Sequence, residues 1–430
     1  MRPLLDLAWP VVLGNLGLVA MGVVDLMVAG TLGEDALAAV GLGHTYSFAL
    51  LIFGLGVASG IDPEVTRAYG ANQPVEAGRT ALHGAVLLGA VGAVIAALHC
   101  VASPLLTALG QPADAVPGAG VYCQVLSVGV PPYLGFVLVR QLLQGGGSMR
   151  PAAWVVLGGN VVNLLADLVL VLWLDQGVAG VGWATVIVRW FMLGGLVWVG
   201  WPVLREAWPG WTLERARLER LVPVALPVGW QLGFEVWAFN VATLLAGTLG
   251  TTEVAAHIAA LSAASMAFMV PMGLSAAATT RVGNHLGAGR PWTTAGWTAL
   301  ALGSLSMTLS GLLFVLAPAQ VVGVYTSEAP VIAVAASILP IAALFGFFDG
   351  LQVVSMGVLR GVGDTRFAAG IALFAHWAVG MPLCVLLMGP YGLTGIWLGL
   401  SAALAMASLL GVGRVAQMSR PGAPVLHDQA

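Results

Sequence analysis

The hydropathy pattern of this chain is a series of long apolar stretches separated by short polar segments. Twelve stretches reach roughly 20 residues or more, the length at which an α-helix crosses the hydrocarbon core of a bilayer. The predicted spans are 7–29, 37–60, 79–101, 117–143, 152–174, 178–202, 221–249, 254–280, 292–317, 329–356, 367–388 and 392–415. The pattern therefore predicts an all-α integral membrane protein with twelve transmembrane helices.

Composition supports this class and excludes others. Hydrophobic residues make up 59% of the 430 positions and charged residues only 8%, whereas a soluble domain has about 25% charged residues. Glycine occurs 58 times, which suits close helix packing in lipid. The net charge of −3 gives no reason to expect a nucleic-acid partner. The three cysteines have no metal-binding or redox spacing, so we expect them to act as small apolar residues.

The basic residues predict the orientation in the membrane. Lysine is absent, and every arginine except Arg189 lies in or beside one set of alternating loops, while the opposite loops carry acidic residues and no arginine. By the positive-inside rule, the arginine side and both termini are cytoplasmic. Arg189 falls within a predicted span, and we expect its side chain to extend to an interface. The alternatives are a counter-ion for Asp167 and a contact with a lipid headgroup.

The chain also contains an internal repeat. With a shift of 217 residues, the segment Ala29-Gly30-Thr31-Leu32-Gly33 meets Ala246-Gly247-Thr248-Leu249-Gly250, and the register continues without a gap over some 65 positions. Each half then holds six spans, and an even number gives both halves the same orientation in the membrane. We expect an amino-terminal lobe at 1–205, a cytoplasmic linker at 206–220, a carboxy-terminal lobe at 221–416 and a cytoplasmic tail at 417–430. Such parallel halves are typical of alternating-access transporters, with substrate bound near the midplane.

Four acidic side chains lie inside the predicted spans, namely Asp25, Asp167, Glu235 and Asp349. Each costs roughly 2.5–3.5 kcal/mol at the centre of a membrane helix, so intramembrane carboxylates are usually functional. Asn163 is four residues before Asp167 and therefore shares its helix face. The repeat does not duplicate these residues, because Asp25 is paired with Ala242 and Glu235 with Leu18. The alternative is structural, with protonated carboxyl groups hydrogen-bonded between helices. We predict that they bind a proton or a metal cation.

Several motifs resemble the multidrug and toxic compound extrusion (MATE) transporters, in their bacterial NorM-type branch. Asp349 and the segment 350–361 that follows it resemble the tenth helix of that family and the loop after it. Asp25 resembles the acidic residue of the first helix, and Glu235 the glutamate of the seventh. The pair Asn163 and Asp167 resembles the helix-5 partners of the first-helix aspartate. The similarity covers essentially the whole chain, although Asp62-Pro63-Glu64 carries more charge than the family pattern leads us to expect.

The resemblance implies a V-shaped fold of two lobes that exports cationic or amphiphilic compounds, driven by inward flow of Na⁺ or H⁺. Asp25, Asn163, Asp167, Glu235 and Asp349 would couple to the cation, and Glu235 with Asp349 could hold Na⁺. A carboxylate that is withdrawn from water and lies near another one tends to take up a proton, so either ion is compatible with this set. Tyr133, Trp230 and Gln352 are candidate residues of the substrate cavity.

We expect no catalytic residues and no cofactor, since there is no phosphate-binding loop and no other enzyme signature. The partners would be small organic cations and membrane lipid, and the protein would act as a monomer in the bacterial inner membrane. Two alternatives remain. One is a lipid-linked oligosaccharide flippase of the same superfamily, which would need a broad cationic cavity. The other is an intramembrane enzyme with paired aspartates, which the full-length repeat disfavours.

Overall fold

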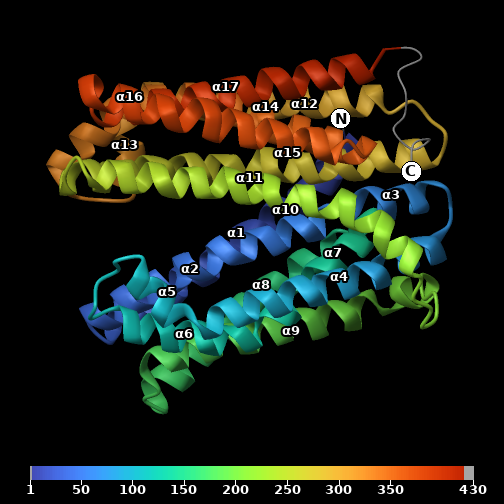
Figure 1. Cartoon of the computed structure of the whole chain (residues 1–430), viewed down its shortest axis with the longest axis horizontal. Helices are drawn as coiled ribbons and strands as arrows, with labels where there is room; N and C mark the ends of the chain where they lie inside the picture. Colours follow the sequence, from blue (N-terminus) through green and yellow to red (C-terminus); the bar gives the residue numbers. More distant parts are fainter. Residues whose placement is uncertain (1, 421–430) are drawn as a thin grey trace. The chain divides into compact units, whose positions relative to one another are not determined.

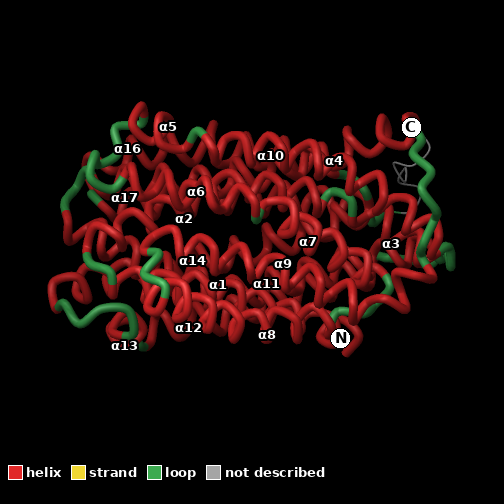
Figure 2. Tube along the Cα trace, turned by 90° about the horizontal axis from the view of Figure 1, so that it is seen from below, coloured by secondary structure: helices red, strands yellow, loops and turns green. Residues whose placement is uncertain are grey.

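The computed structural model of the protein describes residues 2–420. Across this range the chain is helical, with short connecting loops and no β-strand (Figure 2). Eleven helices are long and apolar enough to cross a membrane, and a bent pair of shorter helices brings the number of possible spans to 12. The predicted class and number of spans are confirmed, because apolar length alone is a strong signal for a membrane helix.

The helices fall into two consecutive sets, as the repeat predicts (Figure 1). In the first half they are α1 (Arg2–Thr31), α2 (Glu34–Ser59), α3 (Asp62–Gly70), α4 (Pro74–Cys100), α5 (Ala102–Ala108), α6 (Val116–Val128), α7 (Val130–Gly145), α8 (Arg150–Asp167), the π-helical η1 (Leu168–Trp173) and α9 (Gly177–Glu206). In the second half they are α10 (Arg215–Gly247), α11 (Thr251–Gly287), α12 (Thr293–Leu316), α13 (Pro318–Gly323), α14 (Ala329–Val362), α15 (Thr365–Leu373), the π-helical η2 (Phe374–Gly380), α16 (Met381–Tyr391) and α17 (Leu393–Met418).

The fourth predicted span, 117–143, is the bent one. It consists of α6 and α7, which meet at Gly129 with a bend of 50°. Two prolines in the first turn of α7, Pro131 and Pro132, have no backbone N–H to donate. Prolines are tolerated in the first turn of a helix but not in its interior, so α7 starts anew here instead of continuing α6.

The chain forms two compact units whose boundaries differ from the expected lobes. The N-terminal unit runs from Leu13 to Gly229, and the C-terminal unit contains the described residues up to Val12 together with those from Trp230 onward. Helices α1 and α10 therefore each begin in one unit and end in the other. Each carries a proline close to the point of change, Pro10 in α1 and Pro227 in α10.

The connections around these units also differ from the expected ranges. Helix α9 ends at Glu206 and α10 begins at Arg215, so the connecting segment is shorter than the expected linker at 206–220. Helix α17 extends to Met418, into the expected tail at 417–430, and residues 421–430 of that tail lie outside the described residues.

The first part of α1, up to Val12, packs closely within the C-terminal unit, and the first part of α10, up to Gly229, packs closely within the N-terminal unit. A Cβ atom built on Gly273 of α11 would lie 2.6 Å from a methyl carbon of Val12 and 2.9 Å from the carbonyl oxygen of Ala8. In the other unit, a Cβ atom on Gly56 of α2 would lie 2.5 Å from the carbonyl oxygen of Val228. Gly56 and Gly273 are separated by the 217-residue shift of the repeat. The two halves thus use the same helix crossing, and glycine is required at both crossings because a side chain would displace the neighbouring backbone.

We therefore expect Gly56→Val to lower the thermal stability of the purified protein, by about 1–3 kcal/mol, the usual cost of overpacking a core position. Gly89→Val in α4 is the matched control, because a Cβ atom at Gly89 meets nothing within 4 Å. The measurement is the melting temperature in detergent. An equal melting temperature for the two variants would show that the crossing at Gly56 tolerates a side chain.

Each unit has its own apolar core, and large apolar side chains also cover the outside. Phe136, Leu143 and Leu196 are buried in the N-terminal unit, and Trp397 and Leu339 in the C-terminal unit. On the outside, Trp173 and Trp198 are 82% and 81% exposed, and many leucines and valines are similarly open. Such an extensive apolar surface would be unfavourable in water, and it is the kind of surface that faces lipid in a membrane protein. The chain is a multi-pass membrane protein.

Candidate functional site

Polar side chains gather in the interior of the N-terminal unit, where three helices supply them. Asp25 comes from α1, Asn163 and Asp167 from α8, and Thr185 from α9. The first three are 3%, 1% and 0% exposed. Because Asn163 and Asp167 are four residues apart, one face of α8 presents both. We refer to these four residues as the Asp25 cluster.

Hydrogen bonds connect the members of the Asp25 cluster. The Nδ2 atom of Asn163 donates to Oδ1 of Asp25 at 2.8 Å and to Oδ2 of Asp167 at 3.2 Å. Thr185 Oγ1 donates to the other oxygen of Asp25, Oδ2, at 2.8 Å. Each donor holds a carboxylate oxygen in place, so the position of Asp25 is set by two neighbouring helices.

The two carboxyl groups of this cluster are neighbours, because both accept from the same Nδ2 atom of Asn163. Two carboxylates that share a buried site repel each other, and a proton bound by either one relieves that repulsion. The buried atoms Asn163 Oδ1 and Asp167 Oδ1 have no hydrogen-bond partner. The arrangement can therefore hold a proton between two carboxyl groups, or present several oxygen atoms to a hard cation.

A second group of polar side chains lies inside the C-terminal unit. Glu235 comes from α10, and Asp349 and Gln352 lie three residues apart on one face of α14. They are 7%, 6% and 1% exposed. The Nε2 atom of Gln352 donates to Oε2 of Glu235 at 3.3 Å, and Asp349 is within electrostatic range of Glu235. We refer to these three residues as the Glu235 cluster.

The Glu235 cluster has unused oxygen atoms. Asp349 Oδ1 and Gln352 Oε1 are buried without a hydrogen-bond partner. An unpaired buried oxygen is unfavourable unless a proton, a cation or an ordered water molecule satisfies it. Among the described residues, no group of three or more His, Cys, Asp or Glu side chains could hold a metal ion by itself. A cation here would need amide or hydroxyl oxygens in addition to the carboxylates.

The candidate cavity residues have different surroundings. Gln352 belongs to the Glu235 cluster, as just described. Trp230 is 46% exposed and stacks on Phe234, with ring centroids 5.6 Å apart. The ring of Tyr133 lies under a guanidinium group, with the Cζ atom of Arg189 4.9 Å from its centroid. The expectation that these residues line a substrate cavity stays a prediction.

The structure corrects one expectation and adds one residue. Arg189 does not extend to an interface: its side chain is buried, at 8% exposure, inside the N-terminal unit. Thr185, which the sequence analysis did not select, is a direct partner of Asp25. A threonine is common in membrane helices and carries no charge, so only its spacing of four residues from Arg189 could have drawn attention to it.

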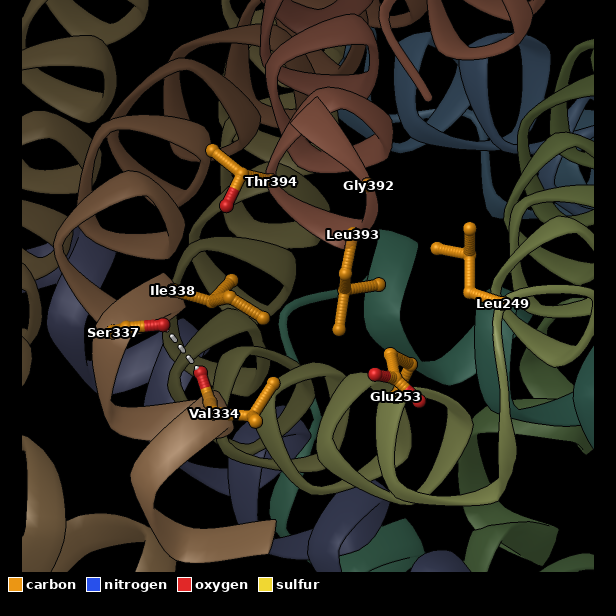
Figure 3. Close-up of a pocket in the computed structure, with 8 residues that line it drawn as sticks. All are labelled: Leu249, Glu253, Val334, Ser337, Ile338, Gly392, Leu393 and Thr394. Atoms are coloured by element: carbon orange, nitrogen blue, oxygen red, sulfur yellow. Dashed lines mark hydrogen bonds between the residues drawn. The ribbon is translucent and has the colours of Figure 1, made fainter. Parts of the chain in front are cut away.

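The C-terminal unit also contains a cavity of about 270 Å³ away from these clusters. Helices α11, α14 and α17, the turn between α10 and α11 and the turn before α17 contribute to its lining (Figure 3). The lining residues are Leu249, Glu253, Val334, Ser337, Ile338, Gly392, Leu393 and Thr394. None of the predicted site residues is among them, and Glu253 is its one ionisable side chain. The cavity is therefore distinct from the carboxylate clusters.

Comparison with known proteins agrees with this geometry. The sequence model of the MatE family matches residues 10–169 and 227–386, two segments offset by the same 217 residues as the internal repeat. The chain is 35% identical to the probable multidrug resistance protein NorM of Mesorhizobium japonicum, over 99% of this chain and 95% of that protein. It is 33% identical to the multidrug resistance protein PmpM of Pseudomonas aeruginosa, over 98% and 92%.

Solved structures show the same fold. The eukaryotic MATE transporter AtDTX14 superposes with a TM-score of 0.89 at 23% identity, covering 96% of this chain and 95% of that one. The Vibrio cholerae MATE transporter VcmN, in its bent form, superposes with a TM-score of 0.87 at 21% identity, covering 97% of both chains. The repeat, the two units and the full-length similarity lead to one assignment: the chain belongs to the MATE family, in its bacterial NorM-type branch.

Proposed function

We propose that the protein is a secondary active multidrug efflux transporter, which exports cationic or amphiphilic compounds in exchange for Na⁺ or H⁺ by alternating access. The observation that carries the proposal is the presence of one buried carboxylate cluster in each unit. Buried carboxylates in membrane helices typically mark ion pathways. The names of the NorM and PmpM relatives support multidrug transport, and the site requires no cofactor.

In this proposal each cluster binds a coupling cation through specific residues. In the N-terminal unit, Asp25 and Asp167 supply the negative charge, while Asn163 and Thr185 hold the carboxylate oxygens in place. In the C-terminal unit, Glu235 and Asp349 supply the charge and Gln352 the positioning amide. The same oxygen donors suit a proton or Na⁺, and separate Na⁺ and pH gradients distinguish the two ions.

The cargo follows from the charge of the interior. The buried ionisable groups within the spans include the four carboxylates and one arginine, Arg189. An interior with this balance attracts organic cations, and the half-exposed ring of Trp230 adds attraction through a cation–π contact. A cation and a coupling ion would compete for the same negative charge, so binding of one favours release of the other.

The remaining expectations belong to the same proposal. The transporter would be a monomer in the bacterial inner membrane with both termini in the cytoplasm, as the arginine distribution predicts. The alternative of a lipid-linked oligosaccharide flippase would require a cationic cavity for an anionic headgroup. The acidic balance of the buried residues favours the efflux transporter.

Reconstituted vesicles test this function. We expect the purified protein to move a fluorescent lipophilic monocation when either a Na⁺ gradient or a pH gradient is imposed, and a matched fluorescent anion to remain untransported. The two gradients are applied separately, so that the active one identifies the coupling ion. Transport of the anion, or of a lipid-linked glycan but not the monocation, would transfer the assignment to the flippase alternative.

A further inference from the structure

Arg189 is a permanent positive charge in the interior of the N-terminal unit, at 8% exposure. It takes part in none of the ion pairs found within residues 2–420. Its Nη1 atom is buried without a hydrogen-bond partner. A buried guanidinium is expensive unless an opposite charge compensates for it. The compensating charge must therefore come from beyond direct contact.

The side chain of Arg189 packs against Gly129 and Tyr133. A Cβ atom built on Gly129 would lie 3.0 Å from Cδ and 3.3 Å from Nη1 of Arg189, so the glycine lets the arginine side chain pack closely against the backbone here. Gly129 is the point at which α6 and α7 meet at 50°, and Tyr133 lies one turn further along α7. The ring of Tyr133 faces the guanidinium at 4.9 Å, a favourable cation–π geometry. The side chain of Arg189 is therefore packed against the bend in the fourth span.

Thr185 and Asp25 connect Arg189 to the Asp25 cluster. Thr185 precedes Arg189 by one turn on the same face of α9 and donates to Asp25. Arg189 is within electrostatic range of Asp25 without forming an ion pair with it. The other ionisable groups facing this region are His44 on α2, His99 on α4, Tyr122 on α6, Tyr133 on α7 and Asp167 on α8.

We propose that Arg189 is the internal counter-ion of Asp25 and Asp167, and that it limits the coupling charge bound by the N-terminal unit to a single positive charge. Two ionised carboxylates without Arg189 would need two cations to reach neutrality. With Arg189 present, one proton or one Na⁺ completes the balance, and an uncompensated buried charge is strongly unfavourable. The shared donor Asn163 holds the two carboxylates next to each other, so one proton or one Na⁺ bound there can serve both. The inference rests on the proposed coupling role of this cluster.

Equilibrium cation binding by the purified full-length protein tests the charge count. Bound ²²Na⁺ and proton uptake are measured per chain in detergent, and each variant is compared with the wild type. Arg189→Gln is expected to bind one additional positive charge, and Arg189→Lys to match the wild type because it keeps the charge. The double variant Arg189→Gln with Asp167→Asn removes one charge of each sign and is expected to return to the wild-type count.

The control is Arg140→Gln, which removes an arginine of α7 whose charge is coupled to Tyr133 and Asp62 and not to Asp25, and which should leave the count unchanged. If Arg189→Gln does not fold, the charge argument predicts that the double variant folds, whereas a packing role predicts that it does not. A wild-type count in Arg189→Gln, or no restoration in the double variant, would overturn the proposal for Arg189. Wild-type binding in Asp25→Asn would instead overturn the coupling role of the cluster.

Discussion

Asp25→Asn should abolish most gradient-driven efflux while the protein still inserts and folds. Asparagine has nearly the shape of aspartate and keeps one oxygen, which can accept from Asn163, while its NH2 group can donate to the hydroxyl oxygen of Thr185. It lacks the negative charge that attracts the cation and cannot share a proton with Asp167. Loss of one charge-assisted contact, roughly 1.5–3 kcal/mol, should weaken cation affinity by about 10- to 100-fold. The measurement is efflux of a fluorescent monocation from vesicles under a Na⁺ or pH gradient.

The matched control is Asp114→Asn, the same substitution at an exposed position in the loop between α5 and α6. It should transport like the wild type, because this carboxylate contacts water and not a buried cluster. Melting temperatures of both variants separate a transport defect from a folding defect. Full efflux by Asp25→Asn at saturating and at limiting gradients would remove Asp25 from the mechanism.

Glu235→Gln and Asp349→Asn should each reduce coupled efflux by a similar factor. Glutamine at 235 can still accept from the Nε2 atom of Gln352, so the contact between α10 and α14 is retained while the charge is lost. Asparagine at 349 leaves Glu235 without its acidic neighbour, so the cluster holds one carboxylate instead of two. Efflux under the two separate gradients also reports which ion depends on the C-terminal unit.

Glu253→Gln provides the control in the same unit. Glu253 lines the cavity of Figure 3 and is a carboxylate outside the Glu235 cluster. Its neutralisation should leave efflux unchanged. If Glu253→Gln were as defective as Glu235→Gln, the loss would follow from a general reduction of negative charge and not from the cluster. Normal transport in both cluster variants would confine coupling to the N-terminal unit.

Much of the candidate site can be predicted from the sequence alone. The bilayer imposes a minimum apolar length, so the spans could be counted from hydropathy. A carboxylate inside such a span is costly, which singles out Asp25, Glu235 and Asp349. The four-residue spacing of Asn163 and Asp167 placed them on one helix face. Thr185 gave no comparable signal, because a neutral hydroxyl in a membrane helix can bond to its own backbone.

The sequence by itself determined the twelve spans, the 217-residue repeat and the intramembrane carboxylates, because each depends on local composition or on identity at a fixed shift. Only the tertiary structure decided that α1 and α10 each begin in one unit and end in the other, since close approach at Gly56 and Gly273 involves residues far apart in the chain. It also decided the position of Arg189. A long cationic side chain can either extend to an interface or be buried. Arg189 is buried because its side chain packs against the bend at Gly129 and against the ring of Tyr133.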